Sequence, residues 1–422
     1  MRKSIVIIRN LDTRGENILF VKDLIRTRGH EPLLIDFSMD APPPAAGDVP
    51  CEEVARRGGL PIDEMRGLYR TDRQRATDNQ IAGVTAIVAD LTGRGRVHGV
   101  IGIGGATSAL VATSVMQKLP FGLPKLMASR VAAHPRYVGS FVGTRDIVMH
   151  NTVLDVVKMN ALLKTQIVNA VGAICGMVEA NAGAAIRFKR PAVAVSSFGL
   201  AEMAAQAVVT MLEQAGFEPV VFHAQGVGDR AMEEMIDEGL FAGVLDLCIG
   251  GVIENLYGGN RDPGPNRLTA AARRGLPVVL ASCRLDMLSL GGRPDRLEVV
   301  KTRARYVQDS MRVQVRTSVD ELQRAADVVA ERLNAARGPF VFLIPTRGWS
   351  SLDRGGGPMR DRLANEAFVE WLTQRLREPS AMREVDLHFY TPEFARRAVD
   401  EFTRLHAQAA TARPGETRAT AS

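Results

Sequence analysis

The stretch that most constrains this chain is residues 99–108, with the sequence GVIGIGGATS. Val100, Ile101 and Ile103 predict a short buried strand, and the glycines after it predict a turn into a helix that begins near Thr107 and Ser108 and continues over residues 109–118. Such a turn presents backbone N–H groups and the positive end of a helix dipole, which suits a phosphate or carboxylate. The turn matches neither GxGxxG nor GxxxxGK[ST], and many α/β domains use a Gly-Gly turn only to pack a helix on a sheet. Both interpretations stay open on this stretch alone.

Strand and helix patterns alternate along the whole chain. Residues 4–8 and 32–36 predict two strands around one amphipathic helix, and a second series of strands and helices begins near residue 190. This alternation implies parallel sheets joined by right-handed crossovers. We therefore predict an α/β fold of two Rossmann-like, doubly wound parallel-sheet subdomains with a cleft between them. The expected boundaries are 1–185 for the first, 186–406 for the second and 407–422 for a disordered tail.

Two segments are less regular. Residues 39–73 contain the run APPP and a Gly-Gly pair, and they predict a long loop or insertion that serves as a lid or an interface arm. Residues 151–179 have an apolar helical pattern, which predicts a helix that closes the first subdomain or packs across an interface. The last helix is expected over residues 392–405.

Composition excludes several classes of protein. The 422 residues carry a net charge of +6 without a block of five or six basic residues, and aromatic residues make up only 5%, which argues against a nucleic-acid surface. The four cysteines are far apart in the sequence and form no CxxC pair, so structural zinc and iron–sulfur sites are not expected. We see no signal-peptide pattern and no apolar run of about 18 residues. The sequence predicts a soluble, cytoplasmic protein that does not bind membranes.

Polar residues follow several predicted strands, at the sheet edge where such folds bind ligands. Asp12, Thr13 and Arg14 follow the first strand and suit an anion, although a helix N-cap beside a solvated arginine explains them equally. In the second half, polar residues also follow predicted strands: His223, Glu254, Asp286, Arg347 and His388, with Asp246 and Asp386 beside them. A histidine, an acid and an arginine at such an edge could serve as general base, orienting group and anion clamp. Each one alone is explained by a cap, a salt bridge or a core histidine. Their recurrence at strand ends makes a shared pocket an equal alternative. Several are acceptable metal ligands, but we assign no protein-bound metal.

A series of short motifs occurs in a fixed order: LDTRGE at 11–16, GIGG at 102–105, GLPK at 122–125, YVG at 137–139, GTRDI at 143–147, FHAQG at 222–226 with RAMEE at 230–234, and GPNRL at 264–268. Together they resemble the family of the ATP-binding domain of the tobamovirus-resistance protein, whose bacterial members are mostly uncharacterised. The resemblance extends over residues 2–405. It implies two Rossmann-like subdomains, binding of ATP with Mg²⁺ in the first, and self-association.

The resemblance also implies which residues contact the nucleotide: Asp12, Thr13, Arg14, Gly15, Gly104, Gly105, Thr107, Ser108, Thr144 and Asp146. The chain departs from the family pattern in both glycine turns. Arg9 and Asn10 replace Gly-Thr, Arg14 replaces Lys, and the second turn is shorter. We therefore consider a related phosphorylated ligand beside ATP.

Two hypotheses follow from these observations. In the first, the N-terminal half binds ATP or a related phosphorylated ligand, and the C-terminal pocket acts on a small acidic metabolite. In the second, the protein is a non-catalytic ligand-sensing or interaction module whose assembly is set by nucleotide. Both predict a homodimer or homotetramer. Convergence of the C-terminal polar side chains on one point favours the enzyme, and dispersed, individually paired side chains favour the module.

Overall fold

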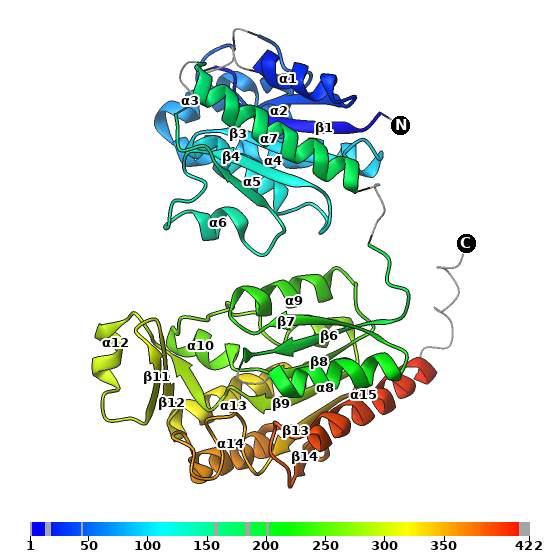
Figure 1. Ribbon diagram of the computed structural model, residues 1–422, viewed down its shortest axis with the longest axis vertical. Coiled ribbons are helices and arrows are strands. Elements are labelled where there is room, and N and C mark those ends of the chain that lie inside the picture. The colour runs from blue at the N-terminus through cyan, green and yellow to red at the C-terminus, as the bar shows by residue number, and fades with distance from the viewer. Residues whose placement is uncertain are drawn as a thin grey trace. The chain divides into compact units, whose positions relative to one another are not determined.

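Two mainly apolar stretches, β1 (Ser4–Arg9) and β3 (Gly99–Gly104), pair in parallel at the centre of the first sheet in the computed structural model (Figure 1). Every residue of both strands is buried, as expected for parallel strands covered on both faces. The structure describes residues 2–12, 18–43, 45–155, 159–181, 186–199 and 202–412, without the side chains of 202–204 and 412. The chain divides into two compact units, Met1–Arg187 and Phe188–Ser422.

The N-terminal unit is built on a parallel sheet with the strand order β2-β1-β3-β4-β5. The remaining strands are β2 (Glu31–Asp36), β4 (Lys125–Ser129) and β5 (Val148–Asn151). This is a doubly wound order in which the connections leave β1 and β3 in opposite directions. The switch point, where such sheets bind ligands, therefore lies at the carboxyl ends of β1 and β3.

Helices cover both faces of this sheet. Ile5, Ile7 and Ile101 point toward α1 (Ile18–Thr27) and α7 (Ala161–Ala180), whereas Val6 and Val100 point to the other face. That second face is covered by α2 (Cys51–Gly58), α3 (Ile62–Thr71), α4 (Arg73–Gly93), α5 (Ala106–Met116) and α6 (Val138–Val142). The alternation of side chains along each strand thus builds two separate cores.

The C-terminal unit repeats this plan with six parallel strands in the order β14-β13-β9-β8-β6-β7. The strands are β6 (Ala192–Ser197), β7 (Glu218–His223), β8 (Gly243–Cys248), β9 (Val278–Cys283), β13 (Phe340–Pro345) and β14 (Met382–Val385). Its switch point lies at the carboxyl ends of β6 and β8.

Two layers of helices also cover this second sheet. One face is covered by α8 (Glu202–Gln214) and α15 (Pro392–Ala412), and the other by α9 (Val227–Asp237), α11 (Ala270–Arg274), α13 (Val319–Asn334) and α14 (Arg362–Arg375). A small antiparallel sheet, β10 (Met287–Ser289), β12 (Arg312–Arg316) and β11 (Arg305–Asp309), packs beside α10 (Gly251–Tyr257) and α12 (Pro294–Val299). A short 3₁₀ helix, η3 (Pro379–Ala381), precedes β14.

The predicted fold class, two Rossmann-like α/β subdomains with parallel sheets, is confirmed. The loop predicted over 39–73 is wrong, because α2 and α3 occupy most of it. Both helices begin directly after a proline and carry acidic residues in the first turn, a helix-start pattern that the proline and glycine content hides. The last helix continues to Ala412, beyond its predicted end at residue 405.

Helix α7 corrects the expectation that no membrane-length apolar segment occurs. It has 20 residues and is the one helix in the described part of the chain that is long and apolar enough to cross a membrane. Its residues Leu163, Ile167 and Ile174 pack in the core against α1 and the first sheet. This is the packing of a core helix, and the described residues give no positive sign of a membrane protein.

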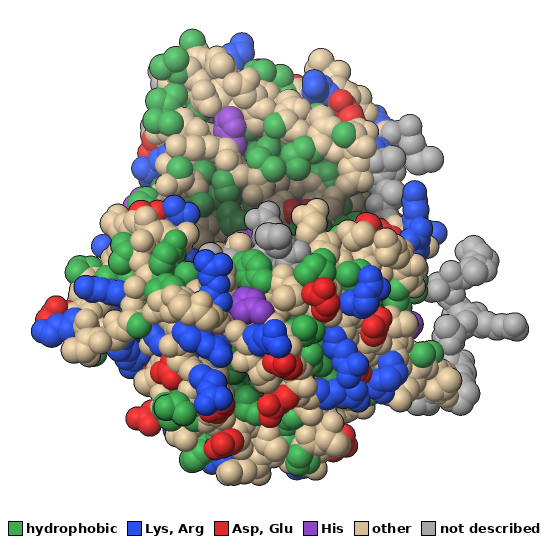
Figure 2. Space-filling model, turned by 60° about the horizontal axis from the view of Figure 1, so that its bottom comes forward, with side chains coloured by type: hydrophobic (Ala, Val, Ile, Leu, Met, Phe, Trp, Pro, Cys, Tyr) green, Lys and Arg blue, Asp and Glu red, His purple; other side chains and the backbone are tan. Residues whose placement is uncertain are grey.

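All four cysteines are buried and free. Burial raises the pKa of the Cys51 thiol to about 12 and that of Cys175 to about 11, so these thiols are poor nucleophiles. Cys248 and Cys283, which are distant in the sequence, are register partners on β8 and β9. On the face of the C-terminal unit turned toward the viewer in Figure 2, Lys and Arg side chains lie among Asp and Glu side chains.

Candidate functional site

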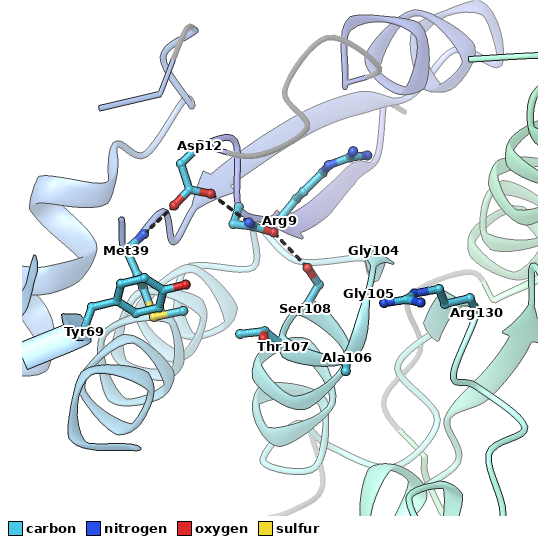
Figure 3. Close-up of a pocket in the computed structure, with 11 residues that line it drawn as sticks. Arg9, Asp12, Met39, Tyr69, Gly104, Gly105, Ala106, Thr107, Ser108 and Arg130 are labelled. Carbon is cyan, nitrogen blue, oxygen red and sulfur yellow. Dashed lines mark hydrogen bonds between the residues drawn. The ribbon is translucent and has the colours of Figure 1, made fainter. Parts of the chain in front are cut away.

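A cavity of about 270 Å³ lies at the switch point of the N-terminal sheet (Figure 3). It is formed by the turn after β1 and the start of α5, with side chains from the loop after β2, from α3 and from the end of β4. Its lining residues are Arg9, Asn10, Asp12, Met39, Tyr69, Gly104, Gly105, Ala106, Thr107, Ser108 and Arg130. The glycine turn and the turn after β1, which are distant in sequence, thus form one site.

The glycines of this turn have separate structural roles. A Cβ on Gly102 would lie 2.6 Å from a methyl group of α5, so this glycine lets the helix pack closely on β3. A Cβ on Gly104 would clash with Ser108 Oγ, which makes glycine necessary at the strand end. Gly105 is the N-cap of α5, and a Cβ there would meet only the Arg130 guanidinium, 4.0 Å away. The space in front of Gly105 is therefore open toward Arg130.

The turn after β1 is fixed by the end of β2. The backbone N–H of Leu11 donates to Asp36 Oδ1 at 3.2 Å and to Ser38 Oγ at 2.8 Å, and the N–H of Asp12 donates to the same hydroxyl at 3.0 Å. Burial raises the pKa of Asp36 to about 6 in spite of these hydrogen bonds. Asp36 and Ser38 thus hold the backbone that carries Asp12.

The Asp12 carboxylate is held in the cavity wall. It accepts a hydrogen bond from the N–H of Met39 at 2.9 Å (Figure 3). It also accepts from the N–H of Asp40 at 3.0 Å and from the amide of Asn10 at 2.8 Å. The other end of the Asn10 amide accepts from Ser108 Oγ at 2.9 Å. A hydrogen-bonded chain therefore connects the turn after β1 to the first turn of α5, and it orients the carboxylate.

The charge around the start of α5 favours an anion. Arg130 extends beside Gly105 toward the helix start (Figure 3), with its Nε 3.6 Å from Asp155 Oδ1. Arg9 lines the same cavity and is almost fully buried. The first N–H groups of a helix have no partner within the helix, and the dipole adds positive potential there. Met39 and Tyr69 provide an apolar wall across from the helix.

A divalent ion would have one carboxylate ligand from the described lining of this cavity, Asp12. In the part of the chain that the structure describes, no group of three His, Cys, Asp or Glu residues could hold a metal by itself. Mg²⁺ bound to nucleotides usually takes one or two protein carboxylates and completes its shell with phosphate oxygens and water. Asp12 fits a magnesium ion that arrives with a phosphorylated ligand.

The ten residues that the resemblance implies divide into three groups. The cavity lining includes Asp12, Gly104, Gly105, Thr107 and Ser108. Thr13, Arg14 and Gly15 lie outside the described residues. Thr144 and Asp146 precede β5 at the amino edge of the sheet, where Asp146 forms an ion pair of 2.8 Å with Lys125 Nζ. The structure thus brings the first group together and places Asp146 at the opposite edge from the cavity.

Sequence reasoning missed Met39, Tyr69 and Arg130. Arg130 directly follows β4, so the rule that assigned the other strand-end residues also applies to it. Met39 and Tyr69 lie in the segment that was expected to be a loop, and no local pattern relates them to residue 105. Only the packing of α3 and the loop after β2 places them at the cavity.

In the C-terminal unit, Glu254 is a fully buried counterion. Its Oε1 accepts a hydrogen bond from Arg284 Nη2 and another from the N–H of Ser289 at 3.2 Å. Burial raises the pKa of Glu254, and the charge of Arg284 opposes that shift. This pairing satisfies the carboxylate within the protein.

Asp286 and His388 meet at one residue, Ser350. Asp286 Oδ2 accepts from Ser350 Oγ at 2.6 Å, and His388 Nε2 lies 3.2 Å from the backbone oxygen of Ser350. Burial raises the pKa of Asp286 to about 6 and lowers the pKa of His388. Both residues follow strand ends, as expected, but each already contacts a protein group.

The two remaining candidates lie apart from this pair. Arg347 forms an exposed bidentate ion pair with Asp386, at 2.8 and 2.9 Å, which raises the pKa of the guanidinium and lowers that of the carboxyl. His223 ends β7 and lines a second cavity of about 470 Å³ with Phe198. Asp246 binds the buried Arg267 and is not open to a ligand. The C-terminal candidates therefore share a sheet edge but are individually paired.

Comparison with known proteins supports a single family over both units. The model for the uncharacterised protein family UPF0261 matches residues 3–183 with its N-terminal domain and residues 190–406 with its C-terminal domain. A UPF0261 protein of Clostridium tetani is 33% identical over 356 residues, which are 84% of this chain and 87% of that protein. A UPF0261 protein of Rhizobium meliloti is 33% identical over 400 residues, covering 94% of this chain and 98% of that protein.

Two further similarities are more limited. The tomato (Solanum lycopersicum) ToMV resistance protein Tm-1(GCR237) is 32% identical over 316 residues, 73% of this chain and 41% of that protein. Among solved structures, the glycosyltransferase SnogD from Streptomyces nogalater covers 95% of this chain at 12% identity, with a TM-score of 0.18. The resemblance predicted from the short motifs is confirmed, and the chain belongs to the UPF0261 family.

Proposed function

We propose that the N-terminal unit binds ATP or a related phosphorylated ligand, with its phosphates at the start of α5. The observation that carries this proposal is the single cavity at the β1/β3 switch point, which joins a helix start, Arg130 and the oriented Asp12 carboxylate. Backbone N–H groups and an arginine supply the donors that phosphate oxygens accept. The cavity of about 270 Å³ lies just below the usual range for whole small-molecule sites, roughly 300–1,000 Å³, so it suits the phosphates better than an entire nucleotide.

Mg²⁺ is expected to accompany this ligand. Asp12 would provide the protein ligand, since its carboxylate lies in the lining and its orientation is fixed by Met39 and Asp40. Arg130 would contact a phosphate oxygen beside Gly105. Met39 and Tyr69 would contact the less polar part of the ligand.

Calorimetric titration with ATP and Mg²⁺ tests the proposal. We expect binding by the wild-type protein that becomes at least about tenfold weaker in Arg130→Met, because one charge-assisted hydrogen bond is lost. Asp12→Asn is expected to weaken binding only when Mg²⁺ is present. The matched control is Arg94→Met, which removes an exposed arginine directly after α4 that pairs only with Asp90 among the described residues. Equal affinity in all four proteins, or no binding in any, would overturn the proposal.

A second candidate function, ligand sensing without turnover, is favoured by how the C-terminal residues are paired. Glu254 neutralises Arg284, Arg347 binds Asp386, and Asp286 accepts from Ser350. An ATP-linked enzyme for a small acidic metabolite would need at least one of these groups to face its substrate.

Sedimentation velocity with and without ATP, run beside a phosphate-release assay, separates the two roles. Sensing predicts that nucleotide changes the population of homodimer or homotetramer while no phosphate is released. Sustained phosphate release that depends on an added small carboxylate would instead favour the enzyme.

A further inference from the structure

The C-terminal unit contains two arginines that share one aromatic ring. The guanidinium carbon of Arg284 lies 4.3 Å from the ring centre of Phe198, and that of Arg261 lies 4.7 Å from the same centre. Phe198 follows β6, and Arg284 follows β9, so the pair lies at the carboxyl edge of the sheet near the β6/β8 switch point. Neither arginine belongs to the residues that the sequence predicts for this unit.

The charge of this cluster is not balanced. Glu254 is the carboxylate that contacts Arg284, and among the described residues its other oxygen accepts only the backbone N–H of Arg261, at 3.4 Å. The side chain of Arg261 has no ion pair among the described residues, and the nearby Arg312 is itself paired with Asp309. Burial and the neighbouring Arg284 lower the pKa of Arg261 to about 10, which indicates that its charge is poorly compensated.

Two buried donors of the cluster are also unsatisfied. Arg261 Nη1 and Arg284 Nε make no hydrogen bond to the residues that the structure describes, although both atoms are shielded from solvent. A buried charged donor without an acceptor costs about 1–3 kcal/mol or more, so an acceptor is expected there. Arg284 also has φ of 72°, and a Cβ on Gly250 would clash with its backbone. The fold thus keeps Arg284 in a strained backbone conformation, which is typical of functional sites.

Phe198 also lines the cavity of about 470 Å³ at the ends of β6 and β7. The lining is mostly apolar, with Ala205, Val209 and Val221, and it contains the polar groups of Ser197, Gln206 and His223. Neither arginine is among the residues that line this cavity, but both contact Phe198, which does line it. A small molecule with an apolar body in the cavity and one anionic end beside the Phe198 ring fits this arrangement.

We propose that Arg261 and Arg284 bind the carboxylate of a small, partly apolar organic acid in the C-terminal unit, and that Phe198 contacts the apolar part of the same molecule. This inference rests on the proposed function in one respect, namely that the ligand of the C-terminal unit is a small acid. The residues that would bind this acid differ from the candidate residues of the sequence analysis. Arg261 provides the adjustable contact, because its guanidinium rests on the Phe198 ring and makes no ion pair or hydrogen bond with another side chain that the structure describes. Arg284 is held by Glu254 and by the backbone oxygen of Ala224, and it sets the position of the site.

The test uses the full chain with three probes at matched ionic strength: butyrate, the neutral isostere butyramide, and inorganic phosphate. We expect butyrate to raise the melting temperature and to bind in calorimetry, whereas butyramide does neither. In Arg261→Gln the affinity for butyrate is expected to fall about tenfold or more, and Arg261→Lys should retain part of it. The control variant Arg312→Gln also removes one positive charge close to Arg261, but Arg312 does not stack on Phe198. It is expected to change the affinity for butyrate less than Arg261→Gln does.

Several results would overturn the inference. These are no effect of butyrate on the wild-type protein, equal binding of butyrate and butyramide, or unchanged butyrate binding in Arg261→Gln. Binding of phosphate but not butyrate would overturn the assignment of a carboxylate. Arg130→Met separates this inference from the proposed function, because that variant is expected to lose nucleotide affinity while it keeps butyrate binding.

Discussion

At the scale of single residues, neighbouring glycines of one turn have different consequences. Gly104 permits the close approach of β3 to Ser108, whereas Gly105 borders open space in the cavity. We predict that Gly104→Ala destabilises the protein by about 1–3 kcal/mol, because the added methyl forces the helix start away from the strand. Gly105→Ala is expected to change stability by much less. Urea denaturation of both variants checks this, and an equal loss of stability would contradict it.

Asp286 makes the stability depend on pH. Burial raises its pKa from 3.8 to about 6, so the folded protein binds this proton more tightly than the unfolded chain does. The resulting stabilisation is fully present below about pH 3.8 and is lost as the pH rises through about 6. This change amounts to at most about 3 kcal/mol. Asp286→Asn keeps a neutral acceptor for Ser350, so the variant should lose this part of the pH dependence.

Unfolding free energies of the wild-type protein and Asp286→Asn, measured across that pH range, give the comparison. We expect the stability of the variant relative to wild type to increase as the pH rises. A constant difference between the two proteins would contradict the raised pKa.

At the scale of elements, helix α13 shows how local sequence fixes an element boundary. Ser318 Oγ accepts from the N–H of Glu321 at 3.3 Å, and the Glu321 carboxylate accepts from the N–H of Ser318 at 2.9 Å, which completes a capping box. We predict that Ser318→Ala lowers the free energy of unfolding by about 1 kcal/mol, whereas Ser318→Asp retains the cap and most of the stability. Denaturant unfolding of the two variants checks this, and equal losses would indicate that the cap has no role.

At the scale of the whole molecule, the two units repeat one doubly wound plan, and each has a cavity at the carboxyl edge of its sheet. The N-terminal cavity lies at the β1/β3 switch point, whereas the C-terminal cavity lies at the ends of β6 and β7. Each unit has cores on both faces of its sheet, so we predict that each folds when expressed alone. The second unit must include Phe188, whose ring lies 6.3 Å from Phe241. A fragment over 188–422 is expected to unfold cooperatively and at a higher temperature than one over 192–422. Non-cooperative melting of the longer fragment would contradict independent folding.

The sequence allowed prediction of the fold more completely than of the candidate site. Buried β-branched runs and helical spacing indicated the parallel strands, because both signals are local. Helices α2 and α3 were missed because proline marks a helix start as well as a loop. At the site, the position after a strand end correctly indicated that Asp12 and Ser108 line the cavity. Asp146 precedes a strand and therefore lies at the opposite edge of the sheet, beside Lys125, which its short motif does not reveal. Arg261 reaches Phe198 only through tertiary packing, and no spacing in the sequence relates the two.

The most direct test of the nucleotide proposal is a crystal structure of the protein with Mg²⁺ and a non-hydrolysable ATP analogue. We predict phosphate density beside the backbone N–H groups of residues 105–107, with Arg130 on a phosphate oxygen and Asp12 on the metal or its water. An analogue bound elsewhere, with this cavity empty in the same crystal, would contradict the account.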